Sequence, residues 1–148
     1  MTEAARVLEI AHDVVADLRR QGAGLDGTDA SLWFVQGVLT SMSTQPKPGD
    51  DMVVLGLAVY VAEVLAATTD GVEVIVDLDG KRVDEIRAVG PDRRTQNVLT
   101  WLWSCREDPD ADNVVFKYLC ALRDFGARDR AAVLSDQLRQ YAEVRKAD

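Results

Sequence analysis

The stretch DMVVLGLAVYVAEVLAATT, residues 51–69, is nearly continuously apolar and decides the fold of the chain. Valine is frequent in it, which suits a strand as well as a helix, but the stretch is too long for a typical strand. A helix that is apolar almost all round is buried, because none of its faces suits water. The stretch therefore predicts a buried helix at the centre of one hydrophobic core.

A β-hairpin is predicted directly after this helix. Apolar and polar residues mostly alternate over residues 72–79, with the period of a half-buried strand. The dipeptide Asp-Gly at residues 79–80 favours a type I′ turn. The return strand, about residues 81–88, places Val83 and Ile86 on opposite faces, so we expect a bulge or an early end there. A third strand or a partner could extend the hairpin.

Apolar residues spaced three and four apart predict further helices on both sides of this section. Two of them, over residues 3–21 and 29–43, precede the central helix, and Asp29 or Ser31 is expected to cap the second. Three more follow the hairpin. The last, about residues 128–146, carries a narrow apolar stripe suited to docking on the domain or in an interface with a second copy.

The connection before the central helix is predicted to be an exposed loop over residues 43–50. Pro46, Pro48 and Gly49 interrupt the apolar periodicity there, since proline fixes φ and removes a hydrogen-bond donor. The whole chain, residues 1–148, is expected to be a single α+β domain. About six helices would pack around one β-hairpin or small antiparallel sheet.

The charge of the chain limits its partners. It has 148 residues, 17 basic and 25 acidic, for a formal net charge of −8. An acidic surface repels phosphates and releases no counterions from nucleic acid, so we expect neither a nucleic-acid partner nor an anionic membrane surface. The longest apolar run, residues 52–67, is interrupted by Glu63 and is shorter than a membrane span.

The residues available for chemistry are few. Charged residues occur throughout residues 1–15, where a secretory signal needs an unbroken apolar segment, so we expect a cytoplasmic protein. Cys105 and Cys120 are too few for a disulfide scaffold. His12 is the only histidine, and no Cys/His set has the spacing of a zinc site. We therefore expect no metal, no cofactor and no catalytic residue.

The segment VIVDLDGK, residues 74–81, resembles the first motif of haloacid-dehalogenase-type phosphohydrolases. In that family the first aspartate attacks phosphorus, the second acts as acid and base, and both help to place Mg²⁺. The resemblance gives these roles to Asp77 and Asp79. Helices are predicted where the family has strands with its further acidic groups and lysine, so a hairpin with outward carboxylates is the other interpretation.

Two other motifs lack the context that their chemistry requires. GAGLDG, residues 22–27, matches a dinucleotide-binding glycine pattern but follows a helix in place of a strand. DPDADN, residues 108–113, opens like an EF-hand loop, yet Asn113 and Leu119 stand where calcium requires Gly and Glu. We expect an acidic loop in which Asp112 or Asn113 caps the next helix.

The polar face of the central helix is the first candidate binding site. Gly56, Tyr60, Glu63 and Ala67 share that face. An ionised carboxylate in a core is costly unless it is paired, so Glu63 must be exposed or meet a partner such as arginine. One interpretation is a polar pocket built by Tyr60 and Glu63. The other is a structural ion pair or a solvent-facing edge.

Two tryptophans are the second candidate. Trp33 and Trp103 fall off the apolar stripes of their helices, whereas Trp101 lies on its stripe. Off-stripe tryptophans anchor interfaces, and they also close the edges of hydrophobic cores. Both interpretations stay open for Trp33 and Trp103.

One further resemblance covers about half of the chain. The segment LGLAVYVAEVL, residues 55–65, precedes Asp70-Gly71 and a strand. It resembles small bacterial domains of unknown function, of actinobacterial type, in which a Gly-x3-Tyr-x2-Glu-Val helix runs into a β-hairpin. The resemblance implies a helix-plus-hairpin fold and supplies no activity, cofactor or catalytic residue.

Three functions are consistent with the sequence. The first is a non-enzymatic protein-interaction module, an acidic immunity- or chaperone-like domain that binds a basic protein or forms a homodimer. The second is a metal-dependent phosphohydrolase that uses the segment Asp77-Leu78-Asp79-Gly80. The third is a small-ligand-binding domain with its pocket at Tyr60 and Glu63.

Overall fold

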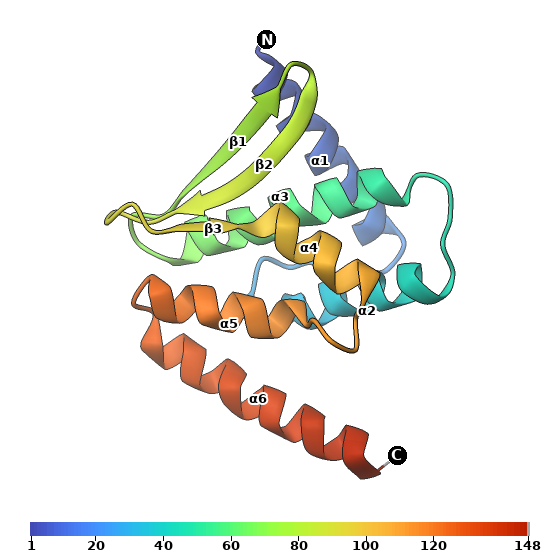
Figure 1. Cartoon of the computed structure of the whole chain (residues 1–148), viewed down its shortest axis with the longest axis vertical. Coiled ribbons are helices and arrows are strands. Elements are labelled where there is room, and N and C mark those ends of the chain that lie inside the picture. Colours follow the sequence, from blue (N-terminus) through green and yellow to red (C-terminus); the bar gives the residue numbers. More distant parts are fainter. Residues whose placement is uncertain (148) are drawn as a thin grey trace.

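The computed structural model describes residues 1–147, and the side chains of residues 1–146. It confirms the α+β class: the described residues form six α-helices and one three-stranded antiparallel sheet (Figure 1). In chain order the elements are α1 (Glu3–Arg20), the 3₁₀ turn η1 (Asp29–Ser31), α2 (Leu32–Thr44), α3 (Asp50–Thr68), β1 (Glu73–Asp79), β2 (Arg82–Val89), β3 (Thr95–Asn97), α4 (Val98–Glu107), α5 (Val114–Asp124) and α6 (Arg128–Ala147).

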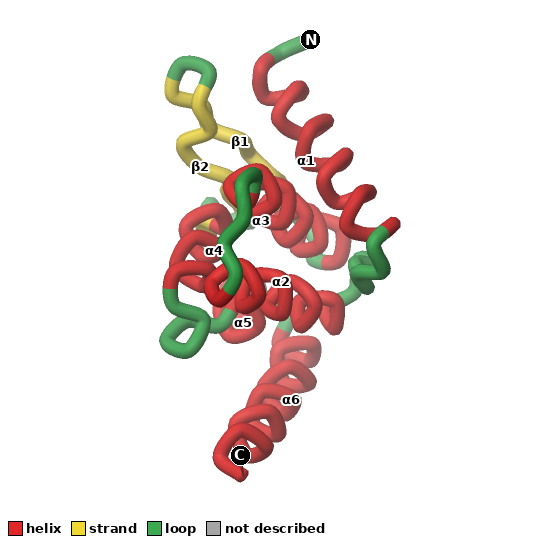
Figure 2. Tube along the Cα trace, turned by 90° about the vertical axis from the view of Figure 1, so that its right-hand side faces the viewer, coloured by secondary structure: helices red, strands yellow, loops and turns green. Residues whose placement is uncertain are grey.

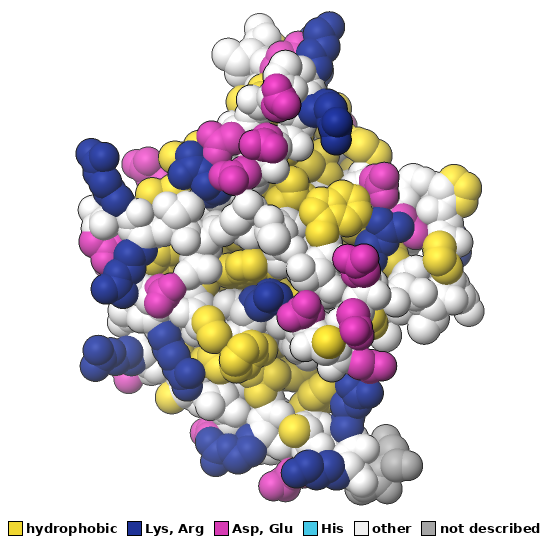
Figure 3. Space-filling model, viewed as in Figure 1, with side chains coloured by type: hydrophobic (Ala, Val, Ile, Leu, Met, Phe, Trp, Pro, Cys, Tyr) yellow, Lys and Arg dark blue, Asp and Glu magenta, His cyan; other side chains and the backbone are white. Residues whose placement is uncertain are grey.

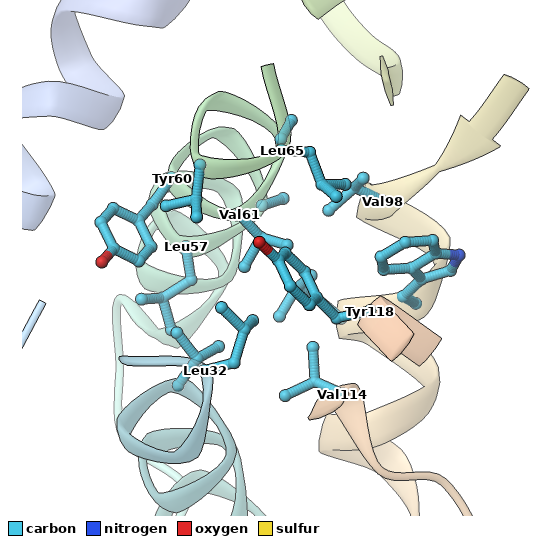
Figure 4. Packing of buried hydrophobic residues seen from close by; sticks show 14 of the residues in the cluster. Leu32, Leu57, Tyr60, Val61, Leu65, Val98, Val114 and Tyr118 are labelled. Carbon is cyan, nitrogen blue, oxygen red and sulfur yellow. The ribbon is translucent and has the colours of Figure 1, made fainter. Parts of the chain in front are cut away.

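Helix α3 is the core helix. Leu57, Val61 and Leu65 are fully buried, and they point into one cluster with Val98 of α4 and Tyr118 of α5 (Figure 4). By length and composition alone α3 could cross a membrane, but more than half of its most apolar window is covered by the rest of the fold. It is the buried helix of a compact fold, as in soluble proteins.

The sheet has the strand order β1-β2-β3. The register of β1 and β2 shifts by one residue between Asp77 and Leu78, which confirms the expected bulge. Leu78 then pairs with Val83 and Val76 with Ile86, and directly opposed residues share a face. The bulge therefore brings both apolar residues of β2 to the core side of the sheet.

The helix ends follow local rules with one exception. Asn113 caps α5 as expected, because its side chain accepts hydrogen bonds from two backbone N–H groups of the first turn. The expected cap of α2 is wrong. Neither Asp29 nor Ser31 caps α2 through its side chain, because η1 intervenes and both side chains bind elsewhere. The connection from α2 to α3 covers the exposed residues 45–49.

Helix α6 lies at the edge of the fold. Ala131 and Leu134 are buried against the body of the domain, whereas residues 139–146 are exposed. Figure 2 shows α6 extending away from the other helices toward the carboxyl terminus. The first half of its apolar stripe is thus used to dock on the domain itself.

Candidate functional site

A cleft between α1 and α3 contains the polar face of the core helix. Its volume is about 320 Å³. Helix α1 contributes His12, Val15 and Arg19, which follow at i, i+3 and i+7 and therefore lie on one face. The α3 residues Tyr60 and Glu63 line the opposite wall. The two predicted residues of the central helix thus lie in one cleft.

The two helices approach closely beside this cleft because Gly56 has no side chain. A Cβ atom built on Gly56 would lie 2.7 Å from Val14 Cγ1 and 2.9 Å from Val14 Cβ, inside van der Waals contact. The glycine therefore determines how near α1 packs to α3. Gly56 lies on the predicted polar face of α3, and the group that approaches it belongs to a helix of the same chain.

Tyr60 is a wall of the cleft whose hydroxyl is already bound. The side chain is buried and lies on the opposite side of α3 from Tyr118 and Val98 (Figure 4). Its hydroxyl accepts a hydrogen bond from the Gly27 backbone N–H at 2.9 Å and lies 2.7 Å from Ser31 Oγ. The hydroxyl therefore holds the turn before α2, and the aromatic ring is the part that faces the cleft.

Glu63 lies at the half-exposed edge of the cleft and pairs with His12. Glu63 Oε1 is 2.7 Å from His12 Nε2, and the two side chains are 42% and 55% exposed. Two of the expectations for Glu63 are thus combined, since it is both partly exposed and paired. The partner is the only histidine of the chain, and not the arginine that was given as an example. Because 51 positions separate the two residues, no local pattern in the sequence indicates the pair.

Arg19 forms the basic end of the cleft, and no pattern in the sequence had indicated it. Its Nε–H donates to the Leu25 carbonyl oxygen at 2.6 Å, and its guanidinium carbon lies 5.9 Å from the centroid of the Tyr60 ring. This geometry combines a hydrogen bond with a cation–π contact. A guanidinium has five N–H donors, so most of them are left for a ligand or for water.

The cleft therefore has an acidic end at Glu63, a basic end at Arg19, and apolar and aromatic surface between them. Small-molecule sites resemble this cleft in composition, with mostly apolar walls and a few polar groups that fix the orientation of the ligand.

In comparisons with protein families, with curated proteins and with solved structures, nothing matches this chain.

The two predicted tryptophans lie elsewhere and apart from each other. Trp33 is half-buried beneath α6, where its Nε1–H donates to Gln137 Oε1 at 3.0 Å. Its ring centroid is 5.0 Å from that of Tyr141. Trp33 thus binds the carboxyl-terminal helix of its own chain. Trp103 lies in a separate hollow beside Met42, with the guanidinium of Arg106 stacked 5.4 Å from its ring centroid.

The first aspartate of the phosphohydrolase-like segment is paired with an arginine. The Asp77 carboxylate accepts two hydrogen bonds from Arg87, one of them from Nη2 at 3.2 Å. The hydrogen bond from Arg87 lowers the pKa of Asp77, against a smaller opposing effect of desolvation. Among the described residues no group of three His, Cys, Asp or Glu side chains is placed to hold a metal ion. Asp77 is occupied by a cross-strand ion pair in which both side chains are partly buried.

The acidic loop 108–113 is also held by local partners. Asp108 accepts from the Ala111 backbone N–H, and Asp110 pairs with Arg145 of α6 at 3.0 Å. On the face shown in Figure 3 acidic and basic side chains are interspersed over the surface. The net charge of −8 is therefore spread in pairs and turns on that face, and it does not form one acidic patch there.

A second polar cluster, at the start of α6, was missed by the sequence analysis. Arg130 donates to both carboxylate oxygens of Asp29, at 2.8 and 2.7 Å, and to Thr68 Oγ1 at 2.7 Å. The Tyr118 hydroxyl also donates to Asp29. Partial burial opposes ionisation of Asp29, but the hydrogen bonds from Arg130 and Tyr118 outweigh it and lower its pKa. Burial, with the contact to Asp29, raises the pKa of Tyr118.

This cluster is structural. It joins η1, the end of α3, α5 and α6 through one guanidinium, and its groups satisfy one another. Arg130 also donates to the Thr68 carbonyl oxygen, so a positive charge sits at the negative end of the α3 dipole. The candidate functional site is therefore the cleft between α1 and α3.

Proposed function

We propose that this protein binds a small organic ligand in the cleft between α1 and α3. The observation that carries the proposal is the cleft itself, where Glu63, His12 and Arg19 surround apolar and aromatic surface. Its volume of about 320 Å³ lies at the lower end of the range of ligand pockets, which are roughly 300–1,000 Å³. The ligand is accordingly small. The absence of an exposed, activated nucleophile at the described cleft residues favours binding over covalent chemistry.

A cleft-blocking variant tests this function. Ala67 is exposed and lines the cleft, so Ala67→Trp fills it without disturbing the core. Met52→Trp places the same side chain on the other end of α3 and is the matched control. We expect ligand-observed NMR against a metabolite library to give binders that Ala67→Trp loses and Met52→Trp keeps. If every wild-type binder also binds Ala67→Trp, the cleft is not the site.

A second candidate function, a protein-interaction module, is favoured by the exposed face of α2. Phe34 is 53% exposed and lies, with Trp33 and Val38, along a groove of about 430 Å³. Exposed apolar surface of this kind marks protein-binding sites. We propose a basic partner, because two copies that each carry a net charge of −8 repel one another. This corresponds to an immunity- or chaperone-like role in the cytoplasm, where the free thiols Cys105 and Cys120 would stay reduced.

Two phenylalanines of equal exposure test the second candidate. Phe34 and Phe116 are each 53% exposed, on α2 and α5. We expect a cationic amphipathic peptide to bind the protein at low salt, Phe34→Ser to weaken that binding, and Phe116→Ser to leave it unchanged. Equal effects of the two substitutions would exclude the α2 face. Self-association that Phe34→Ser abolishes in sedimentation would show a homodimer in place of a basic partner.

A further inference from the structure

The two ends of the cleft carry opposite charges. Glu63 supplies a carboxylate at one end, and Arg19 supplies a guanidinium at the other. Oε1 of Glu63 faces His12, and the one acceptor that the described residues offer to Arg19 at short range is the Leu25 carbonyl. The second carboxylate oxygen and the Nη groups therefore have hydrogen-bonding capacity for a ligand.

Helix geometry limits the distance between these ends. The guanidinium of Arg19 lies over Tyr60, and Tyr60 is three residues, about 4.5 Å of helix rise, from Glu63 on α3. His12, the partner of Glu63, is seven residues from Arg19 on α1, about 10 Å of helix rise. Along the helix axes the two groups are thus offset by about 5–10 Å, and a ligand that reaches both needs charged ends at a similar separation.

The surface between the charged ends is apolar. Val15, Val64 and Tyr60 line the cleft between them. A ligand with a single charge would leave one end of the cleft without a counterpart, whereas a ligand with opposite charges at its two ends satisfies both. An extended dipeptide spans about 7 Å, within this distance, and so does an ω-amino acid of similar length.

From these observations we infer that the ligand of the cleft is dipolar: an ammonium group at Glu63, a carboxylate at Arg19, and a short apolar body between them. Short peptides and ω-amino acids form this chemical class. The inference rests on the proposed ligand-binding function. To that function the inference adds two properties of the ligand, its opposite charges at the two ends and its length.

Three matched probes test the inference. 6-Aminohexanoate has both charged ends, while hexanoate and hexylamine share its chain and have one charge each. We expect ligand-observed NMR titrations to show that 6-aminohexanoate binds about fivefold or more tightly than either analogue, since each ion pair is partly solvent-exposed. Ala67→Trp should abolish binding of all three.

Variants that remove one charge test which group of the ligand binds at each end of the cleft. Arg19→Gln should weaken 6-aminohexanoate and hexanoate and leave hexylamine unchanged, and Glu63→Gln should weaken 6-aminohexanoate and hexylamine and leave hexanoate unchanged. Arg20→Gln is the control, because Arg20 is exposed and pairs with Asp17 outside the cleft. Thermal unfolding of each variant shows that the fold is retained.

The outcomes separate the inference from the proposed function. If the three probes bind equally, or a single-charge analogue binds best, and Ala67→Trp abolishes that binding, the cleft binds ligands but the dipolar inference is wrong. The same holds if library compounds bind and 6-aminohexanoate does not. If neither the probes nor any library compound binds in a manner that Ala67→Trp abolishes, the inference and the proposed function both fail.

Discussion

The protein with glycine at position 56 should be more stable than the Gly56→Ala variant, although alanine is the better helix former. In the interior of an exposed helix, replacing Gly by Ala stabilises by about 0.8–1.0 kcal/mol. At Gly56 the new methyl group would lie 2.7 Å from Val14 Cγ1 and 2.9 Å from Val14 Cβ. Overpacking of this kind costs about 1–3 kcal/mol. The net effect expected for Gly56→Ala is a loss of about 1 kcal/mol of unfolding free energy.

A matched glycine supplies the control. Gly37 is exposed in the middle of α2, and a Cβ built there meets nothing within 4 Å. Gly37→Ala should therefore stabilise the protein by about 0.5–1 kcal/mol. The two substitutions are chemically identical, yet they should change the free energy of unfolding in opposite directions.

Urea unfolding followed by circular dichroism measures both effects as changes in the midpoint at constant m-value. A double-mutant cycle with Val14→Ala adds a second test. It removes the Cγ1 contact and keeps the Cβ contact, so it should recover about half of the overpacking cost. Equal stabilisation by Gly56→Ala and Gly37→Ala, or no coupling to Val14, would refute the account of the α1–α3 contact.

Three further predictions concern other parts of the fold. Arg130→Met should cost about 2–3 kcal/mol of unfolding free energy in urea, because it leaves Asp29, 23% exposed, without its counterion; a loss below 0.5 kcal/mol would contradict a structural role for the cluster. Because the pKa of Asp29 is lowered in the fold, its stabilisation is complete above the ordinary carboxyl pKa and disappears as pH falls through the lowered value. Asp29→Asn should therefore lose less stability than the wild type between about pH 5 and pH 2, and parallel losses would exclude this linkage. Burial raises the pKa of Cys105 to about 12, so native protein should resist iodoacetamide at Cys105 and react there after unfolding, as mass spectrometry would show.

The features that sequence patterns predicted are those with a strong period. The apolar stretch around Val61 predicted the core helix because burial on every side leaves no polar face. The bulge was predictable because Val83 and Ile86 could not otherwise reach the same face of the sheet. Asn113 was predictable as a cap because capping is a contact within one turn of helix.

The features that escaped prediction depend on residues far apart in the chain. Aspartate is a common helix-capping residue, yet Arg130 and Tyr118 bind the Asp29 carboxylate more strongly than a backbone N–H would. A third strand was one of the two expected extensions of the hairpin and is confirmed, but its place in the chain was not predictable. Strand β3, Thr95–Asn97, has no apolar residue, and a tight turn at Gly90 brings it alongside β2. The pair of His12 and Glu63 exists because two helices cross, which neither helix reveals alone.

The cluster at Arg130 also sets an order of events during synthesis. Arg130 follows its partner Asp29 by 101 positions, and Gln137 follows its partner Trp33 by 104 positions. At about 5–20 residues per second, translation delivers these partners roughly 5–20 s after the residues that they cover. Until then a growing chain on the ribosome carries an Asp29 carboxylate without its Arg130 counterion and a Trp33 indole without its Gln137 partner. The region around Asp29 and Trp33 is therefore completed only after α6 has been translated.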